Sequence, residues 1–524
     1  MKTKRFILLI PFLSVLFSLQ AQPFRVQESL AFKSKILNQE IKYTTVLPEG
    51  YFESKKSYPV LYLLHGLGDN EISWLEYGHV AQYFDHMVKK KSIEPFICIM
   101  PHGFRSYYSD FYDGSFSYQQ MFIKELVPFI DSQYRTLPSA GKRAVIGYSM
   151  GGFGALMLPL KYPDIFSVSI PLSASIRTDE QYISEDQNAW NEQWGKIFGG
   201  VNEFGKNRIT DYYMQNSPFY IIKNKSSEEL KKIAFFIENG DKENTLCRSN
   251  EELHMLLLEK QVPHIYNIKA GGHEFRFWRD ALPEAFRFAD AQFRGKIYTP
   301  EAKKEKQVYS FPKSLVTEQK SIGNKTFRII YPEKQQTISR SYPTIYFISD
   351  LNEKKQNILI NKYEKEFSNG ELPAVLFCFV PVKYGGSSLL NEIIPYMEKD
   401  GKARSGRRFR AIWGYENGGA DVLKQAFEKD IFTACVLTEA NLSASQTEIE
   451  NLITQKESLR NQIWFYVDTQ PASDVYIGNG FLHINLREQG FTHEYRVRTD
   501  VSNYNFLLSG FMSALTYVCQ KFHY

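Results

Sequence analysis

Short apolar runs alternate with longer segments of mixed character through the first half of the chain. The runs within SYPVLYLLHG (57–66), PFICIMP (95–101) and KRAVIGY (142–148) are too short for helices and are bounded by glycine or proline, which is typical of buried strands. The segments between them are long enough to form helices. Strands and helices in alternation predict a mostly parallel sheet flanked by helices, an α/β fold.

The alternation stops after residue 297. The stretch TPEAKKEKQ (299–307) is polar and charged. Residues 298–312 are therefore predicted to be a linker.

The order of segments before the linker returns after it. SYPVLYLLHGLGD at 57 resembles SYPTIYFISDLNE at 341, the run 95–101 resembles 375–381, and GYSMGG at 147 resembles GYENGG at 414. Residues 235–264 align with 464–493 without a gap, at a spacing of 229 residues. Agreement of these segments in one order predicts an internal duplication, with tandem domains at 22–297 and 313–524.

The length of the chain agrees with two domains, and its net charge limits the classes of binding partner to be expected. The 524 residues exceed what one hydrophobic core ordinarily supports. A net charge of +5 is small for this length, and Lys and Arg form no stripe interleaved with aromatic side chains. Nucleic acid is therefore not expected as a partner.

The N-terminus MKTKRFILLIPFLSVLFSLQAQPF has a basic head, an apolar run and a small residue, Ala21, suited to cleavage. A membrane anchor is the alternative, but the run contains Pro11 and is short for a bilayer span. We expect a cleavable signal peptide at 1–21, a periplasmic or secreted protein, and no stable membrane anchor after cleavage. The five cysteines are too sparse for a disulfide framework; Cys98 and Cys378, each within an apolar run, are expected to be buried thiols.

GYSMGG at 147 fits the pattern G-x-S-x-G, between a strand-like run and a helix-like run. In such a turn the serine hydroxyl projects above the sheet, and Gly147 and Gly151 leave room for the backbone. Ser149 is therefore the candidate nucleophile.

A serine nucleophile needs a base and an acid that orients the base. His273, in AGGHEFRFW after the final strand-like run, is the candidate base. His264 is the rival, but the second copy repeats it as His493, which indicates a packing role. The acid is expected in the loop GDKENT, where Glu243 is favoured and Asp241 is the alternative.

Backbone N–H groups must stabilise the negative charge that develops on the substrate oxygen. The N–H of Met150, just after the nucleophile, and that of Leu67, in LLHGLGD, are the candidate donors. His65 is interpreted as a structural hydrogen-bonding residue. No metal or cofactor is expected, because the chain has neither an H-E-x-x-H pattern nor a pair of closely spaced cysteines.

Several of these motifs occur together in an order that resembles the esterase D superfamily. They are LLHGLGD, SYYSDFYDGSFSY, FIKELVPFIDSQYRT, AVIGYSMGGFGALMLPLKYPDIF and PHIYNIKAGGHEFRFW, within about residues 27–295. The superfamily includes tributyrin esterases, feruloyl and acetylxylan esterases of carbohydrate esterase family 1, S-formylglutathione hydrolases and enterochelin esterases. The resemblance implies an α/β-hydrolase-like fold, with Ser149 as nucleophile, His273 as base, and Leu67 and Met150 as oxyanion donors. This chain departs from the family at the acid, where G-D-K-E replaces the usual G-x-x-D.

The second copy keeps the glycines of the turn and lacks the candidate catalytic residues. In the alignment Glu416 takes the place of Ser149, and Ser502 takes the place of His273. Gln470 replaces Asp241, and Ala472 replaces Glu243. In the loop of the oxyanion donor, Ser349 replaces His65 and Asp350 replaces Gly66. It is also shorter in the connections that would hold a substrate. The second domain is therefore predicted to be a catalytically degenerate copy of the α/β-hydrolase-like first, retained as a structural partner or as a binding module.

The features together predict a secreted serine ester hydrolase that acts through an acyl-enzyme. Its substrates are expected to be acetyl or feruloyl esters of plant polysaccharides, or short-chain acyl esters. The segment 175–230 is rich in aromatic residues, which either form a platform for a sugar or aryl ring or pack the helices of that segment; they are Trp190, Trp194, Phe198, Tyr212, Tyr213, Phe219 and Tyr220. A serine peptidase or acyltransferase on the same fold, and a non-catalytic carbohydrate-binding protein, are the alternatives.

Overall fold

The computed structural model describes residues 25–300, 312, 314–332, 341–399, 402–442, 446–499 and 503–522. The predicted signal peptide, 1–21, and residues 301–311 of the predicted linker lie outside the described residues. Among the described residues, no helix combines the length and the apolar character needed to cross a bilayer.

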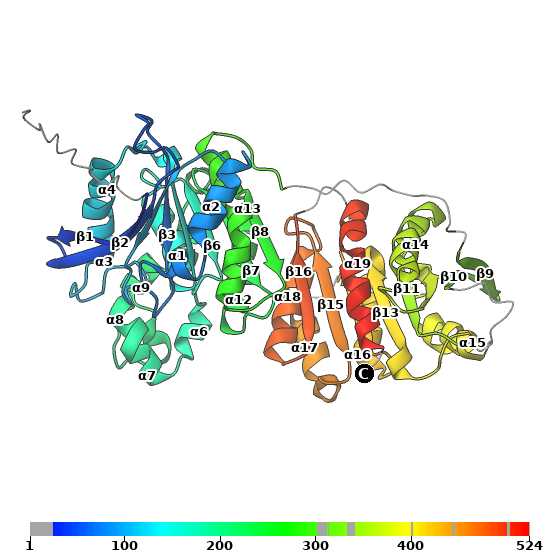
Figure 1. Cartoon of the computed structure of the whole chain (residues 1–524). Coiled ribbons are helices and arrows are strands. Elements are labelled where there is room, and N and C mark those ends of the chain that lie inside the picture. The colour runs from blue at the N-terminus through cyan, green and yellow to red at the C-terminus, as the bar shows by residue number, and fades with distance from the viewer. Residues whose placement is uncertain are drawn as a thin grey trace, which may run out of the picture.

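A mixed sheet runs through both halves of the chain (Figure 1). The first half contributes β1 (Val26–Ser34), β2 (Gln39–Val46), β3 (Val60–Leu64), β4 (Ile97–Pro101), β5 (Arg143–Tyr148), β6 (Val168–Leu172), β7 (Ala234–Gly240) and β8 (His264–Lys269). The second contributes β9 (Val316–Ile322), β10 (Lys325–Tyr331), β11 (Thr344–Ile348), β12 (Leu376–Val380), β13 (Arg410–Tyr415), β14 (Ala434–Thr438), β15 (Trp464–Thr469) and β16 (His493–Val497).

Helices cover both faces of the sheet, as the alternating pattern predicts. Those of the first half are α1 (Ser73–Glu76), α2 (Val80–Lys89), α3 (Tyr118–Met121), α4 (Val127–Gln133), α5 (Met150–Lys161), α6 (Asp179–Ile183), α7 (Gln187–Ala189), α8 (Gly195–Phe198), α9 (Asp211–Asn216), α10 (Pro218–Asn224), α11 (Ser227–Leu230), α12 (Thr245–Glu259) and α13 (Phe275–Phe293). Those of the second half are α14 (Glu353–Ser368), α15 (Ile394–Lys399), α16 (Gly419–Glu428), α17 (Gln446–Thr454), α18 (Tyr476–Glu488) and α19 (Asn503–Lys521).

The central strands are apolar along their whole length because helices cover them on both sides. Every residue of β3, β4, β5 and β6 is buried, whereas the edge strand β9 is at most half-buried. One apolar layer continues across both halves on one face of the sheet. On the other face, α2 and α13 cover the first half, and α14 and α19 cover the second.

The two halves have the same strand order. It is β1-β2-β4-β3-β5-β6-β7-β8 in the first and β9-β10-β12-β11-β13-β14-β15-β16 in the second. In each half the first three strands of this order pair antiparallel and the rest pair parallel. Both halves thus have the same α/β topology.

The halves meet edge to edge at the centre of the sheet, where β8 pairs antiparallel with β16 (Figure 1). The paired residues are Ile268 and Val497. They are separated by 229 residues, the spacing at which residues 235–264 align with 464–493. Each residue therefore faces its own counterpart, so a local two-fold axis passes between the two strands.

Helices α12 and α18 pack together beside this strand pair. Arg248 forms an ion pair with Glu488 at 2.6 Å, and the Tyr476 hydroxyl donates to the carboxylate of Glu251. At Gly480 the end of the Met255 side chain lies against the glycine, where a Cβ would come within 2.7 Å of the methionine's terminal methyl group. The contact between the halves thus combines backbone, apolar and charged groups.

The five cysteines are all buried and none forms a disulfide. The expectation of buried thiols is confirmed for Cys98 and Cys378, which lie in β4 and β12.

The buried Glu251 should make stability depend on pH. Burial raises the pKa of Glu251 from its ordinary 4.5 to about 8. The folded state then binds more protons than the unfolded state between these values, so the free energy of unfolding falls as the pH rises from 4.5 to 8. Because glutamine cannot ionise, Glu251→Gln should gain melting temperature relative to the wild type as the pH is raised from about 5.5 to about 8.5. Scanning calorimetry tests this, and a melting-temperature difference that is constant over that range would contradict it.

Candidate active site

Ser149 lies between the end of β5 and the first residue of α5. Its backbone has φ 55° and ψ −116°, a strained conformation for a residue with a Cβ. Hydrogen bonds hold it there: Ser149 N donates to Leu172 O at 3.0 Å, and Ser149 O accepts from Ser175 N at 2.9 Å. The turn places the serine hydroxyl at the carboxyl end of the parallel strands.

The glycines of GYSMGG are needed because the backbone is crowded. A Cβ on Gly147 would lie 2.2 Å from Gly151 O, and a Cβ on Gly151 would lie 2.2 Å from Leu64 O. No side chain fits at either position without moving the main chain.

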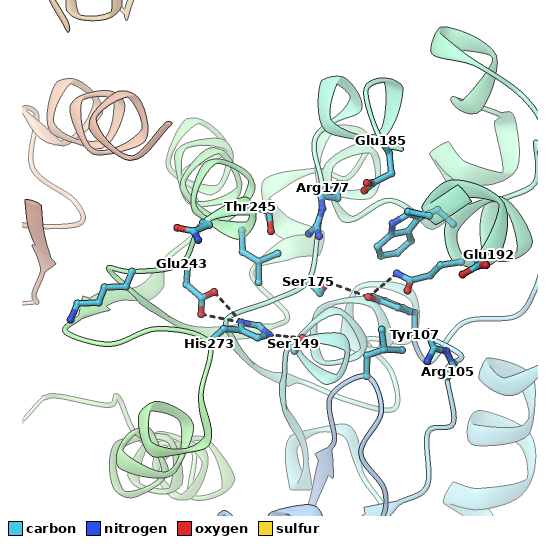
Figure 2. A pocket seen from close by; sticks show the side chains of 17 residues that line it. Arg105, Tyr107, Ser149, Ser175, Arg177, Glu185, Glu192, Glu243, Thr245 and His273 are labelled. Atoms are coloured by element: carbon cyan, nitrogen blue, oxygen red, sulfur yellow. Dashed lines mark hydrogen bonds and ion pairs between the residues drawn. The ribbon is translucent and has the colours of Figure 1, made fainter. Parts of the chain in front are cut away.

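Ser149, His273 and Glu243 form one chain of hydrogen bonds (Figure 2). The Ser149 hydroxyl lies 2.9 Å from His273 Nε2 and can donate to it, and His273 Nδ1 donates to Glu243 Oε2 at 3.0 Å. Glu243 is buried, whereas the imidazole is open to the cavity. The ring of Trp278 packs edge-on against the imidazole at 4.9 Å between centroids and fixes its orientation.

Asp241, the alternative acid, does not contact His273. Its carboxylate is fully buried and accepts hydrogen bonds from Gly271 N at 3.0 Å and from Arg496 Nη1 at 2.6 Å. Of the two acids that the sequence leaves open, the structure places Glu243 beside the candidate base.

The two candidate oxyanion donors lie beside Ser149. Met150 is the first residue of α5, so its N–H is not needed by the helical hydrogen bonds. Leu67 lines the cavity, and within the described part of the chain its N–H makes no hydrogen bond. Both groups are available to a negatively charged oxygen.

His65 holds the loop that carries Leu67. Its Nδ1 donates to Gly66 O at 2.8 Å, and its Nε2 accepts from Gly103 N at 2.7 Å. Burial lowers the pKa of His65 to about 4, so the ring is neutral, as this pattern requires. The structural role expected for His65 agrees with these contacts.

His264, the rival base, lies at the contact between the halves. It is 2.5 Å from His254 Nδ1 and donates to Val262 O. Its counterpart His493 repeats both contacts, with His483 at 2.8 Å and with Phe491 O. The matching contacts of His264 and His493 indicate that both are packing residues.

The hydrogen-bonded chain opens into a cavity of about 790 Å³ lined by residues between 67 and 273, all from the first half. Figure 2 shows Tyr107 and Ser175 beside Ser149, with Arg177 and Arg105 further around the wall. The Tyr107 hydroxyl accepts from Gln193 Nε2 at 3.0 Å. Among the described residues, neither arginine has an ion-pair partner. Sequence reasoning identified the loop of Tyr107 without singling out any of its residues, because only the folded loops show which side chains face Ser149.

The aromatic residues of the segment 175–230 mostly pack the helices of that segment. Trp190, Phe198 and Tyr213 are fully buried, and the Trp194 ring stacks on that of Phe198 at 5.8 Å. Of the seven aromatic residues singled out from the sequence, only Trp194 lines the cavity. The packing interpretation therefore holds for most of them.

The second half keeps the crowded turn without the hydrogen-bonded chain. Glu416 has φ 49°, and a Cβ on Gly418 would lie 2.4 Å from Ile348 O, as for Ser149 and Gly151 in the first half. Glu416 has no hydrogen bond to a histidine among the described residues. Ser502, the counterpart of His273, lies outside them.

The strain at Ser149 can be tested by stability. Glycine adopts positive φ without a Cβ clash, so Ser149→Gly should be more stable than Ser149→Ala by about 1 kcal/mol, after the greater freedom of glycine in the unfolded chain is subtracted. Alanine is the matched control because it removes the hydroxyl and keeps the strain. Thermal or urea unfolding of the two variants measures the difference, and equal stability would argue against a strained turn.

Comparison with known proteins agrees with this geometry. Residues 34–289 match the family model Esterase, described as "Putative esterase". An endo-1,4-beta-xylanase/feruloyl esterase of Xylanibacter ruminicola is 35% identical over 127 residues, 23% of this chain and 18% of that protein. An acetyl esterase of Caldicellulosiruptor saccharolyticus is 24% identical over 266 residues, 49% of this chain and 94% of that protein.

A solved structure of a ferulic acid esterase aligns with 52% of this chain and 100% of its own, at 26% identity and a TM-score of 0.44. These matches cover about half of the chain at most, and the match to the xylanase/feruloyl esterase covers less than a fifth of that relative. The family match spans Ser149, Glu243 and His273. Residues 34–289, just under half of the chain, are thus similar to the esterase family.

Proposed function

We propose that the first half of the chain is a serine esterase that hydrolyses carboxylic esters through a covalent acyl-enzyme. The observation that carries the proposal is the hydrogen-bonded chain from Ser149 through His273 to Glu243, at the floor of a cavity. A serine hydroxyl bonded to an imidazole that is held by a buried carboxylate is the arrangement that activates serine as a nucleophile.

In the first stage Ser149 Oγ attacks the ester carbonyl while His273 Nε2 takes the hydroxyl proton. The imidazolium that forms is stabilised by Glu243, and the oxyanion accepts hydrogen bonds from the N–H groups of Leu67 and Met150. Collapse of the tetrahedral intermediate breaks the bond to the alcohol. His273 gives its proton to the departing oxygen, which leaves the acyl group on Ser149.

In the second stage water enters the same site. His273 removes a proton from the water as it attacks the acyl carbonyl, and the same two N–H groups hold the second oxyanion. The carboxylic acid leaves when Ser149 Oγ regains the proton from His273. No step requires a group beyond these residues and water.

For the substrate we propose acetyl or feruloyl esters of polysaccharides. The cavity of about 790 Å³ has room for a sugar or an aryl ring, and Tyr107 and Trp194 in its wall give such a ring an apolar surface. The names of two relatives, a feruloyl esterase and an acetyl esterase, agree with this class. Export through the signal at 1–21 belongs to the same proposal, because polysaccharide esters lie outside the cell.

For the second half, 313–524, we propose a degenerate duplicate of the esterase domain, 22–297, with no reaction of its own. The shared strand order, the self-equivalent pairing of Ile268 with Val497 and the crowded turn at Glu416 support a common origin. Glutamate at the turn offers no hydroxyl to acylate.

The test of the esterase proposal is a panel of p-nitrophenyl acetate, p-nitrophenyl butyrate, methyl ferulate and acetylated xylan. The wild type should hydrolyse at least one of them, and Ser149→Ala should lose at least about 10³-fold in kcat. If no ester is cleaved, or if the alanine variant keeps its activity, the esterase proposal is wrong. Preference for methyl ferulate or acetylated xylan over the p-nitrophenyl esters would support the polysaccharide class.

The identity of the acid gives a second prediction. Glu243→Gln keeps the size of the side chain and removes the charge that stabilises the imidazolium, so kcat should fall about 10²- to 10⁴-fold with little change in KM. The measurement is steady-state kinetics on the best ester of the panel. A Glu243→Gln variant within threefold of wild-type kcat would remove Glu243 from the mechanism.

A further inference from the structure

One buried carboxylate connects three segments of the molecule. Asp241 is fully buried, and its Oδ1 accepts from Gly271 N at 3.0 Å. Its Oδ2 accepts from Arg496 Nη1 at 2.6 Å and from Tyr495 N at 3.4 Å. Two of these partners come from β16, in the second half of the chain.

These contacts lie next to the catalytic groups. Asp241 precedes Glu243 by two residues, and Gly271 precedes His273 by two residues. The two loops are also joined by their backbones, since Asp241 N donates to Lys269 O at 2.9 Å and Lys242 N donates to Gly271 O at 2.8 Å. Whatever holds Asp241 therefore holds both the acid loop and the base loop.

The second half supplies the positive charge that this position needs. The Arg496 side chain is only 13% exposed. Arg487, from α18, also donates to the backbone carbonyl of Asp241. Without Arg496 the carboxylate of Asp241 would be a buried negative charge without a cation, an arrangement that distorts or opens its surroundings.

The ion pair breaks the local two-fold symmetry. At the spacing of 229 residues, the counterparts of Asp241 and Arg496 are Gln470 and Asn267, neither of which is charged. The charged pair exists only on the side of the contact that carries the hydrogen-bonded chain. The second half contributes no residue to the lining of the cavity, so any effect of it on the reaction is indirect, through its contacts with the first half.

We infer that Arg496 is a positioning residue for the reaction of the first half: through Asp241, it holds the loops of Glu243 and His273 in register with Ser149. The inference rests on the proposed esterase function. The second half is then a brace for the catalytic loops, built on the edge strand of a domain without its own reaction.

The first test is Arg496→Gln in the full-length chain. We expect kcat to fall about 10- to 100-fold while KM stays within about twofold, the size of effect seen when the support of a catalytic group is removed. Arg248→Gln is the matched control, because it breaks the bidentate pair with Glu488 between the same two halves and touches neither loop. It should lower the melting temperature and keep kcat, and Arg496→Lys should recover part of the loss. If Arg496→Gln and Arg248→Gln have kcat values within twofold of each other, the inference is overturned.

A double-mutant cycle asks whether Arg496 acts through Asp241. Asp241→Asn should reduce kcat, and adding Arg496→Gln should then cost little more, because the contact is already broken. The double variant also leaves no unpaired buried charge, so it stays informative if Arg496→Gln does not fold. Independent, multiplicative losses would show that Arg496 does not work through Asp241.

Amide hydrogen exchange gives a readout that needs no substrate. Peptides covering 240–246 and 270–275 should exchange faster in Arg496→Gln than in the wild type, and should be unchanged in Arg248→Gln. Equal exchange in the two variants would overturn the inference. If no ester is hydrolysed yet these peptides respond only to Arg496→Gln, the bracing contact stands and the esterase proposal is what has failed.

Discussion

The arrangement of the molecule depends on the pairing of two edge strands. A sheet that ends at β8 would expose a row of backbone N–H and C=O groups, and so would a sheet that ends at β16. The antiparallel contact at Ile268 and Val497 covers both edges at once. The ladder between β8 and β16 is short, so the side chains around it make many of the interactions between the two halves. The fully buried Asp241 and the largely buried Arg496 lie at its end.

On the proposed bracing role, this contact is how the second half, without a serine at the turn, supports the proposed reaction of the first half. On the proposed mechanism, Ser149 needs its imidazole and carboxylate held in the productive geometry, and both come from loops at the edge of the first sheet. Loops at an edge have neighbours on one side only. The second half supplies the missing neighbour, so the loops of Glu243 and His273 lie between two packed units.

The sequence sufficed for the parts of the site that are local. Ser149 follows from a turn whose glycines are within four residues of each other, and His273 from its place after the last strand of the half. The repeat also separated His264 from His273, since a histidine with a counterpart in the second half is expected to serve packing, and the contacts of His264 and His493 agree with that role. The sequence favoured Glu243 over Asp241 but left both acids open. The two acids lie in one loop, and their roles differ because Asp241 is paired with Arg496. Arg496 lies 255 residues further along the chain and reaches Asp241 because β8 and β16 pair. The wall of the cavity, with Tyr107 and Arg177, is equally non-local.

The turn at Glu416 has nearly the same φ as the turn at Ser149, although the side chain is different. One substitution is enough to remove a nucleophile, but the positive φ at this position is enforced by the packing of Gly414 and Gly418 against neighbouring main chain. To relax it, the turn, the start of α16 and the end of β11 would have to move together. The second half therefore carries a backbone strain of about 1–3 kcal/mol that no longer presents a nucleophile. On the proposed duplication, the shape of the turn has outlasted its chemistry: a change of the residue at 416 leaves the packing of Gly414 and Gly418, and with it the path of the backbone, in place.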